Sequence, residues 1–162
     1  MSERLWSLAT PKGVQLDAVT RGGIPEMTQE DVALAAAGLA RIEFAAAMFS
    51  LAGDDSMAGR LRTHLLEFLL AERELHQWTK WAENIDGARI RFAEPLVELF
   101  LAEERRPCVF QAAPHLRAVA LRVEQSEWRR AISHQWAAVA GEYQRRLLTA
   151  QEHVQRKMRE RG

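Results

Sequence analysis

The chain has 162 residues, of which 48% are hydrophobic, and this length and composition suit one domain or two very small ones. Its net charge at pH 7 is zero, and no uninterrupted apolar stretch approaches the roughly 18 to 20 residues that cross a bilayer. Arg41 and Glu43 interrupt the longest apolar run, at 33–52, and the N-terminus lacks the apolar core of a signal peptide. We therefore expect a cytoplasmic protein without membrane association.

Residues 1–26 are predicted to form an extended arm, because prolines and glycines interrupt any helical period there. These residues are Pro11, Gly13, Gly22, Gly23 and Pro25. The first helix is predicted at 29–51, where apolar residues keep a 3.6-residue period and Gly53 supplies a C-terminal stop. Thr28 is its predicted N-cap, in a reciprocal capping box with Asp31.

Two more helices are predicted in the middle of the chain, at 57–82 and 88–105, with a turn at 84–87 between them. Pro95 lies inside the second of these helices. Because proline lacks a backbone N–H, it either kinks that helix or occupies the first turn of a restarted one. Residues 107–114, bounded by two prolines, are predicted to be a connector.

No useful length of sequence alternates as a strand does, so the predicted fold class is all-α, a compact bundle of about five helices. The predicted organisation is an N-terminal arm at 1–26, a helical body at 27–113 and a basic, helix-turn-helix-like region with the C-terminal helix at 114–162. Residues 1–113 carry 12 Lys and Arg and 17 Asp and Glu, a net −5, whereas 114–162 carry 10 and 5, a net +5. A basic segment on an acidic body favours an anionic partner, although a terminal helix with solvated charge has the same composition.

The basic region is predicted to contain a short helix at 114–124, a tight turn at Gln125 and Ser126, and a long helix at 127–160. Ser126 is the predicted N-cap of the long helix. A short helix, a turn and a second capped helix are typical of a helix-turn-helix unit, whose second helix enters the major groove of DNA.

The spacing of residues in the long helix predicts which side chains face solvent. Trp128, Ile132 and Trp136 lie four residues apart and are expected to face the core. The side chains expected to face outward and to bind bases or phosphates are Arg129, Arg130, Ser133 and His134. The residues expected to contact the DNA backbone from the preceding helix are Arg117 and Arg122. The residues also fit an ordinary helical hairpin with a charged outer face.

No motif supplies a catalytic or metal site. The glycines stand singly at turns, and Cys108 is the only cysteine, so a cysteine-built zinc site is excluded. Di-iron sites in helical bundles need a Glu three residues before a His, which none of the five histidines has. His64 and Glu67 share a helix face as a predicted surface contact. We therefore expect a binding protein that is not an enzyme and that has no cofactor, no metal ion and no small-molecule substrate.

Three stretches carry a resemblance to a known family: Thr10-Pro11-Lys12, the run from Asp31 through Ala35, Gly38 and Phe44 to Phe49, and Arg117-Ala118-Val119 followed by Trp128 and Arg130. In this order the chain resembles the late-gene antitermination proteins of lambdoid phages, the lambda-type Q family. That family carries a cysteine-rich zinc finger between its central helices and its C-terminal part. Residues 107–114, with Cys108 alone, occupy that place, so the chain resembles a variant without the finger.

The resemblance implies a DNA-binding transcription antitermination factor that engages double-stranded DNA at a phage late promoter, in the cytoplasm of a bacterial host cell. It implies further that the protein meets RNA polymerase with its sigma factor there, transfers to the polymerase and suppresses termination. The residues themselves are also compatible with a second function, that of a protein-binding protein. In that alternative the chain is a small helical inhibitor or adaptor that binds a host protein and never contacts DNA.

Overall fold

The computed structural model describes residues 27–72, 83–105 and 115–162. The predicted arm at 1–26, the connector at 107–114 with Cys108, and the last part of the predicted helix at 57–82 lie outside these residues. The part of the chain that the structure describes forms helices joined by turns, with no strand, which confirms the all-α fold class.

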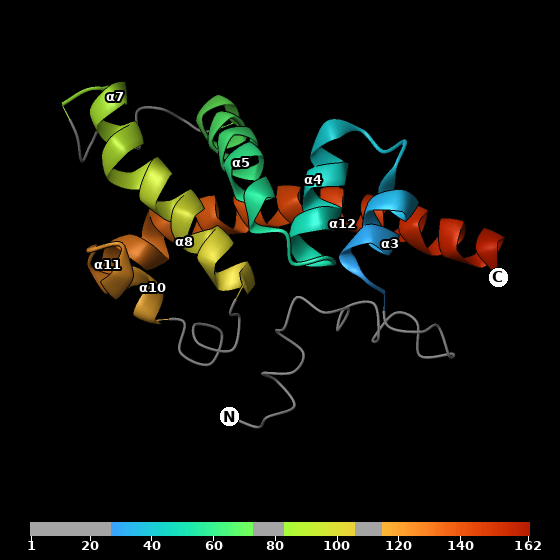
Figure 1. The fold of residues 1–162 in the computed structure, drawn as a ribbon. Coiled ribbons are helices and arrows are strands. Elements are labelled where there is room, and N and C mark those ends of the chain that lie inside the picture. The colour runs from blue at the N-terminus through green and yellow to red at the C-terminus, as the bar shows by residue number, and fades with distance from the viewer. Residues whose placement is uncertain (1–26, 73–82, 106–114) are drawn as a thin grey trace.

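The helices follow one another along the chain as α3 (Gln29–Ala36), α4 (Arg41–Ser50), the 3₁₀-helix η1 (Asp55–Met57), α5 (Ala58–Glu72), α7 (Ile85–Ala88), the π-helix η2 (Arg89–Ala93), α8 (Glu94–Arg105), α10 (His115–Ala120), α11 (Gln125–Glu127), the π-helix η3 (Trp128–Ile132) and α12 (Ser133–Arg161). Figure 1 shows that α12 runs the length of the molecule and that α3, α4, α5 and α8 lie across it. The longest helix therefore forms the support on which the others pack.

The helix predicted at 29–51 is in fact two helices. The capping box of Thr28 and Asp31 starts α3 as predicted, but α3 ends at Ala36 and α4 starts only at Arg41. Gly38 separates them with a φ of 92°, a left-handed conformation that glycine adopts without steric cost. The prediction of one continuous helix was wrong because breaking the chain here lets both short helices pack against α12.

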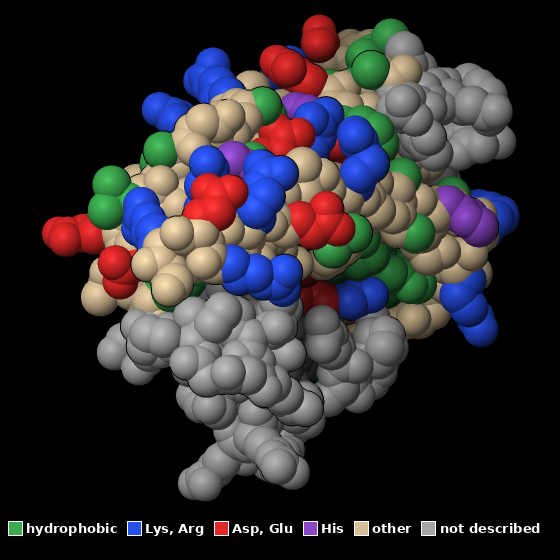
Figure 2. Space-filling view, turned by 90° about the vertical axis from the view of Figure 1, so that its right-hand side faces the viewer, with side chains coloured by type: hydrophobic (Ala, Val, Ile, Leu, Met, Phe, Trp, Pro, Cys, Tyr) green, Lys and Arg blue, Asp and Glu red, His purple; other side chains and the backbone are tan. Residues whose placement is uncertain are grey.

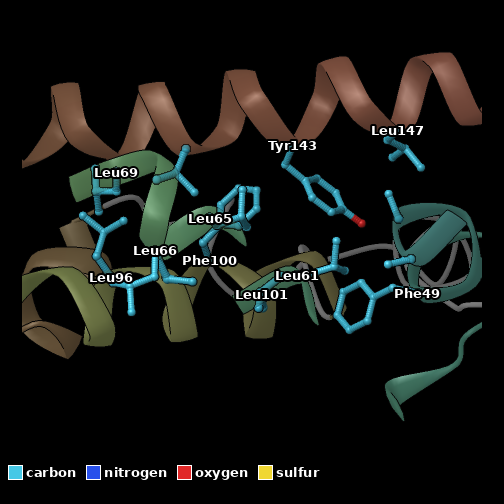
Figure 3. Packing of buried hydrophobic residues seen from close by; sticks show 14 of the residues in the cluster. Phe49, Leu61, Leu65, Leu66, Leu69, Leu96, Phe100, Leu101, Tyr143 and Leu147 are labelled. Carbon is cyan, nitrogen blue, oxygen red and sulfur yellow. The ribbon is translucent and has the colours of Figure 1, made fainter. Parts of the chain in front are cut away.

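One hydrophobic core joins the two regions that the sequence analysis separated at 113/114. Tyr143 and Leu147 of α12 point into the core, where Leu61 of α5, Phe100 of α8 and Phe49 of α4 lie (Figure 3). The Tyr143 ring packs edge-on against Phe100, with 5.5 Å between ring centroids. Its hydroxyl pairs with the hydroxyl of Ser50 in α4. Residues of 27–113 and of 114–162 therefore pack together as parts of one core.

Pro95 is accommodated by a π-helical turn. The N–H of Glu94 donates to the carbonyl of Arg89, five residues earlier, and α8 begins at Glu94 with Pro95 as its second residue. The helical conformation is unbroken from η2 into α8, so Pro95 follows a π-helical turn inside a continuous helix and is not in the first turn of a separate one. Asn84 caps α7 by accepting a bond from Gly87, so residues 84–87 begin this helix.

A network of buried charges ties α12 to α4 and α5. Arg146 donates to Glu142 on its own helix and to Glu43 on α4, each at 2.7 Å. Arg145 donates to Glu142 as well, and Nε2 of His64 on α5 lies 3.5 Å from the same carboxylate. Burial raises the pKa of Glu142, but the hydrogen bonds from Arg146 and Arg145 outweigh it and hold the pKa below the ordinary value.

Candidate nucleic-acid interface

The turn between α10 and α11 is closed by backbone hydrogen bonds. The N–H of Val123 donates to the carbonyl of Ala118 at 3.0 Å, and the N–H of Arg122 donates to that of Val119 at 3.1 Å. This pair of bonds is a Schellman motif, which places its last-but-one residue in the left-handed region. Here that residue is Arg122, with a φ of 56°, so an arginine occupies a position where glycine is usual.

The helix after this turn starts earlier than predicted. Residues 121–124 form the turn, α11 begins at Gln125, and Glu124 is its N-cap without a side-chain hydrogen bond. Ser126 lies inside the first helical turn, so its predicted role as N-cap is wrong. The Schellman motif ends α10 at Ala120, and the chain needs only four residues to enter the next helix.

The tryptophan stripe faces the core as predicted. Trp128, Ile132 and Trp136 are 8%, 2% and 7% exposed. Trp128 and Trp136 pack against each other at 5.9 Å between ring centroids. Residues eight apart in a regular α-helix point about 80° away from one another. The π-helix η3 absorbs one residue, since the N–H of Ser133 donates to the carbonyl of Trp128, and so brings both tryptophans to one face.

The burial of this stripe leaves Arg129, Arg130 and His134 exposed on the outer side, as predicted. Ser133 is half-buried, and its hydroxyl donates to the carbonyl of Arg129 at 3.3 Å. Arg122 is exposed at the adjoining turn. Among the described residues, no carboxylate lies within ion-pair distance of Arg122, Arg129 or Arg130. These exposed cations are therefore available to an external anion.

Arg117 does not belong to this exposed group. Its guanidinium makes two hydrogen bonds to the buried carboxylate of Glu103 on α8, including Nε to Oε2 at 2.9 Å. It also lies over the Trp136 ring, 4.4 Å from the centroid, and its side chain is 18% exposed. We correct the prediction that Arg117 contacts DNA, because the side chain is committed to fixing α10 against α8.

The positive charge of residues 114–162 is partly neutralised within the protein. Arg146 is shared between Glu43 and Glu142, and Lys157 lies 3.3 Å from Glu160. Figure 2 looks at the end of the molecule that carries the C-terminus, and basic and acidic side chains are interspersed there. At this end of the molecule the positive charge therefore does not form one continuous basic surface.

His64 of α5 lies outside the corner between α10 and α11, and its contacts differ from the predicted ones. His64 faces Glu142 of α12 within the buried network, rather than only the solvent beside Glu67 as predicted. The only signal of this network in the sequence was the pair Glu142 and Arg146, which are four residues apart.

Within 27–72, 83–105 and 115–162, no group of three or more His, Cys, Asp or Glu is placed to hold a metal ion. No helix in these ranges is long and apolar enough to cross a membrane.

The fold and the site define an all-α protein with exposed arginines at the corner where α10 turns into α11 and η3. Comparisons with protein-family models, with curated proteins and with solved structures found no match to this chain. The resemblance to the lambda-type Q family therefore remains a prediction.

Proposed function

We propose that this protein binds double-stranded DNA through the α10–α11 corner, with Arg122, Arg129, Arg130 and His134 as the contacting residues. The observation that supports the proposal is the packing of η3: the buried Trp128 and Trp136 hold the helix so that arginines without a described acidic partner face outward. Arginines can bind guanine edges and phosphates with two hydrogen bonds each.

The corner has the parts of a helix-turn-helix unit. Helix α10 is fixed to the body through Arg117 and Glu103, and the next helix begins after a four-residue turn. Figure 1 places the corner at the end of α12 opposite the C-terminus, where no described helix lies over it. In this arrangement Arg129 and Arg130 are offered to the major groove, and Arg122 to a phosphate beside it.

We further propose that the DNA is a phage late promoter and that the protein acts there as an antitermination factor on RNA polymerase with its sigma factor. This step rests on the resemblance to the lambda-type Q family. Of the matched C-terminal residues, Arg117 and Trp128 support the fold here, whereas Arg130 is exposed. The likeness in this segment thus includes both structural residues and one proposed contact.

The DNA contact is tested with the double variant Arg129→Ala, Arg130→Ala. We expect about 100-fold weaker binding to promoter DNA, because each good base contact contributes about 1–3 kcal/mol. The affinity of the parent protein should fall steeply with salt concentration, and the slope should be smaller for the variant. Both quantities are measured by fluorescence anisotropy over a range of salt concentrations.

The matched control is Arg159→Ala, Arg161→Ala, which removes the same charge from the other end of the same helix. Equal losses in both double variants would indicate a general charge effect and would contradict the proposed face. Antitermination is tested by transcription through a downstream terminator with and without the protein. A stable complex with a host protein, without salt-sensitive DNA binding, would instead favour the inhibitor or adaptor.

A further inference from the structure

A polar cavity of about 520 Å³, open to solvent and lined mostly by exposed residues, lies between α4 and α5. This volume is within the range of small-molecule sites, which is about 300–1,000 Å³, and exceeds what a single inorganic anion fills. The polar residues that line it are Arg41, Ser56, Arg60, Thr63, His64 and Glu67. None of the roles proposed for the α10–α11 corner uses this cavity.

The cavity wall carries two cations for which the structure describes no acidic partner, and Arg60 has only a long hydrogen bond to the sulfur of Met57. No described carboxylate lies within ion-pair distance of Arg41 or Arg60, and Glu67 is the only acidic residue in the described lining. The hydroxyls of Ser56 and Thr63 already donate to Asp54 and to the carbonyl of Gly59. Recognition of an anion would therefore come mainly from the two guanidinium groups.

The start of α4 adds to the positive potential of this cavity. Its N-cap, Ala40, provides no side-chain acceptor, so the amides of Arg41 and Ile42 are not capped. Glu43 is the acidic residue of this first turn, but its carboxylate is bound to Arg146. The amides of a helix start favour anions, and Arg41 and Ile42 of this start are among the residues that line the cavity.

We propose that this cavity binds a small molecule that carries a phosphate group. Arg41 and Arg60 hold the phosphate by charge-assisted hydrogen bonds. Glu67 can accept a hydrogen bond from a hydroxyl or amino group in the rest of the molecule. His64 connects the cavity wall to Glu142 of α12, so an occupied cavity is in contact with the central charge network.

The test is a titration of the full chain with ribose 5-phosphate, inorganic phosphate and ribose, followed by the NMR signal of the Gly59 amide in the cavity wall. We expect saturable shifts with ribose 5-phosphate, weaker saturable shifts with inorganic phosphate, and none with ribose. Arg41→Gln, Arg60→Gln should weaken ribose 5-phosphate binding by at least about tenfold, because two charge-assisted contacts are lost. Glu67→Gln should strengthen it severalfold, because a repelling charge is removed.

The matched control is Arg62→Gln, two residues from Arg60 on the same helix. Arg62 pairs with Glu98 at 3.0 Å and is absent from the described lining, so phosphate binding should be unchanged. Arg129→Ala, Arg130→Ala should also bind ribose 5-phosphate like the parent, which separates this site from the DNA surface. Shifts that do not saturate would overturn the proposal. Equal losses of ribose 5-phosphate affinity in the Arg41→Gln, Arg60→Gln variant and in the Arg62→Gln variant would also overturn it. So would a Gly59 shift produced by DNA but not by ribose 5-phosphate.

Discussion

Arg122 and Arg117 show how neighbouring arginines on one short segment come to have different roles. Arg122 lies in the turn with a left-handed backbone, exposed and without a described acidic partner. Arg117, five residues earlier, is held by Glu103 and by the Trp136 ring. A non-glycine residue at positive φ is strained by about 1–2 kcal/mol, so Arg122 is retained at a cost in stability. This strain fits a residue kept for contact with a partner.

Arg122→Gly should separate stability from binding. We expect the free energy of unfolding to rise by about 1 kcal/mol, because glycine adopts the left-handed conformation without strain. DNA affinity should fall severalfold, and the slope of log affinity against log salt should decrease by about one unit, as one phosphate contact is lost. Urea denaturation and anisotropy measure the two effects. A variant that is both more stable and equally good at binding DNA would remove Arg122 from the interface.

The helices of this protein are shaped by interruptions of the regular α-helix. Gly38 separates α3 from α4, and the π-helices η2 and η3 each absorb one additional residue. In η3 the result is that Trp128 and Trp136 share the core face and Arg129 and Arg130 face outward. The presentation of the candidate interface therefore depends on the local winding of the helix as well as on the order of its residues.

Gly38→Ala and Gly141→Ala should change stability in opposite directions. A Cβ at either position meets no atom within 4 Å, so neither substitution creates a clash. Gly38 has a φ of 92°, where alanine is strained, and we expect a loss of about 1–2 kcal/mol. Gly141 is exposed within α12, where alanine should add about 1 kcal/mol. Urea denaturation of both variants measures this, and stabilisation by both would contradict the break between α3 and α4.

At the scale of the whole molecule, α12 joins the other helices through a continuous core and one buried charge network. Burial raises the pKa of both Glu43 and Glu142, but hydrogen bonds and the nearby positive charges of Arg146 and Arg145 together lower it by more, so both carboxyls have a lowered pKa. A carboxyl whose pKa is lower in the folded state than in the unfolded state stabilises the protein at pH values above its unfolded-state pKa. That contribution is lost as pH falls through the folded pKa.

Arg146→Met should destabilise the protein most at neutral pH. We expect the free energy of unfolding at pH 7 to fall by about 2–4 kcal/mol, because Glu43 is left buried without its partner and Glu142 keeps only Arg145 and the nearby His64. As pH falls below the ordinary carboxyl value of 4.5, protonation should narrow the difference between variant and parent. Urea denaturation at several pH values checks this. A difference that does not change with pH would indicate lost packing by the arginine stem instead.

The sequence by itself determined the features that depend on local pattern. Helical periodicity predicted the all-α class, Thr28 and Asp31 predicted the start of α3, and the four-residue steps from Trp128 to Ile132 and Trp136 predicted a buried stripe. Each of these depends on residues within one or two helical turns, where backbone geometry limits which side chains share a face. For the same reason the outward direction of Arg129 was predictable.

Only the tertiary structure decided which charges are free and where the helices break. Arg117 pairs with Glu103, which lies 14 residues earlier in the chain, and Arg146 pairs with Glu43, which lies 103 residues earlier. Such pairs form because the core brings distant helices together, and burying an unpaired charge is costly. The cavity beside Arg41 and the break at Gly38 likewise depend on how α3, α4 and α5 pack along α12. The spacing of residues within one helix does not predict which residues of distant helices they will contact.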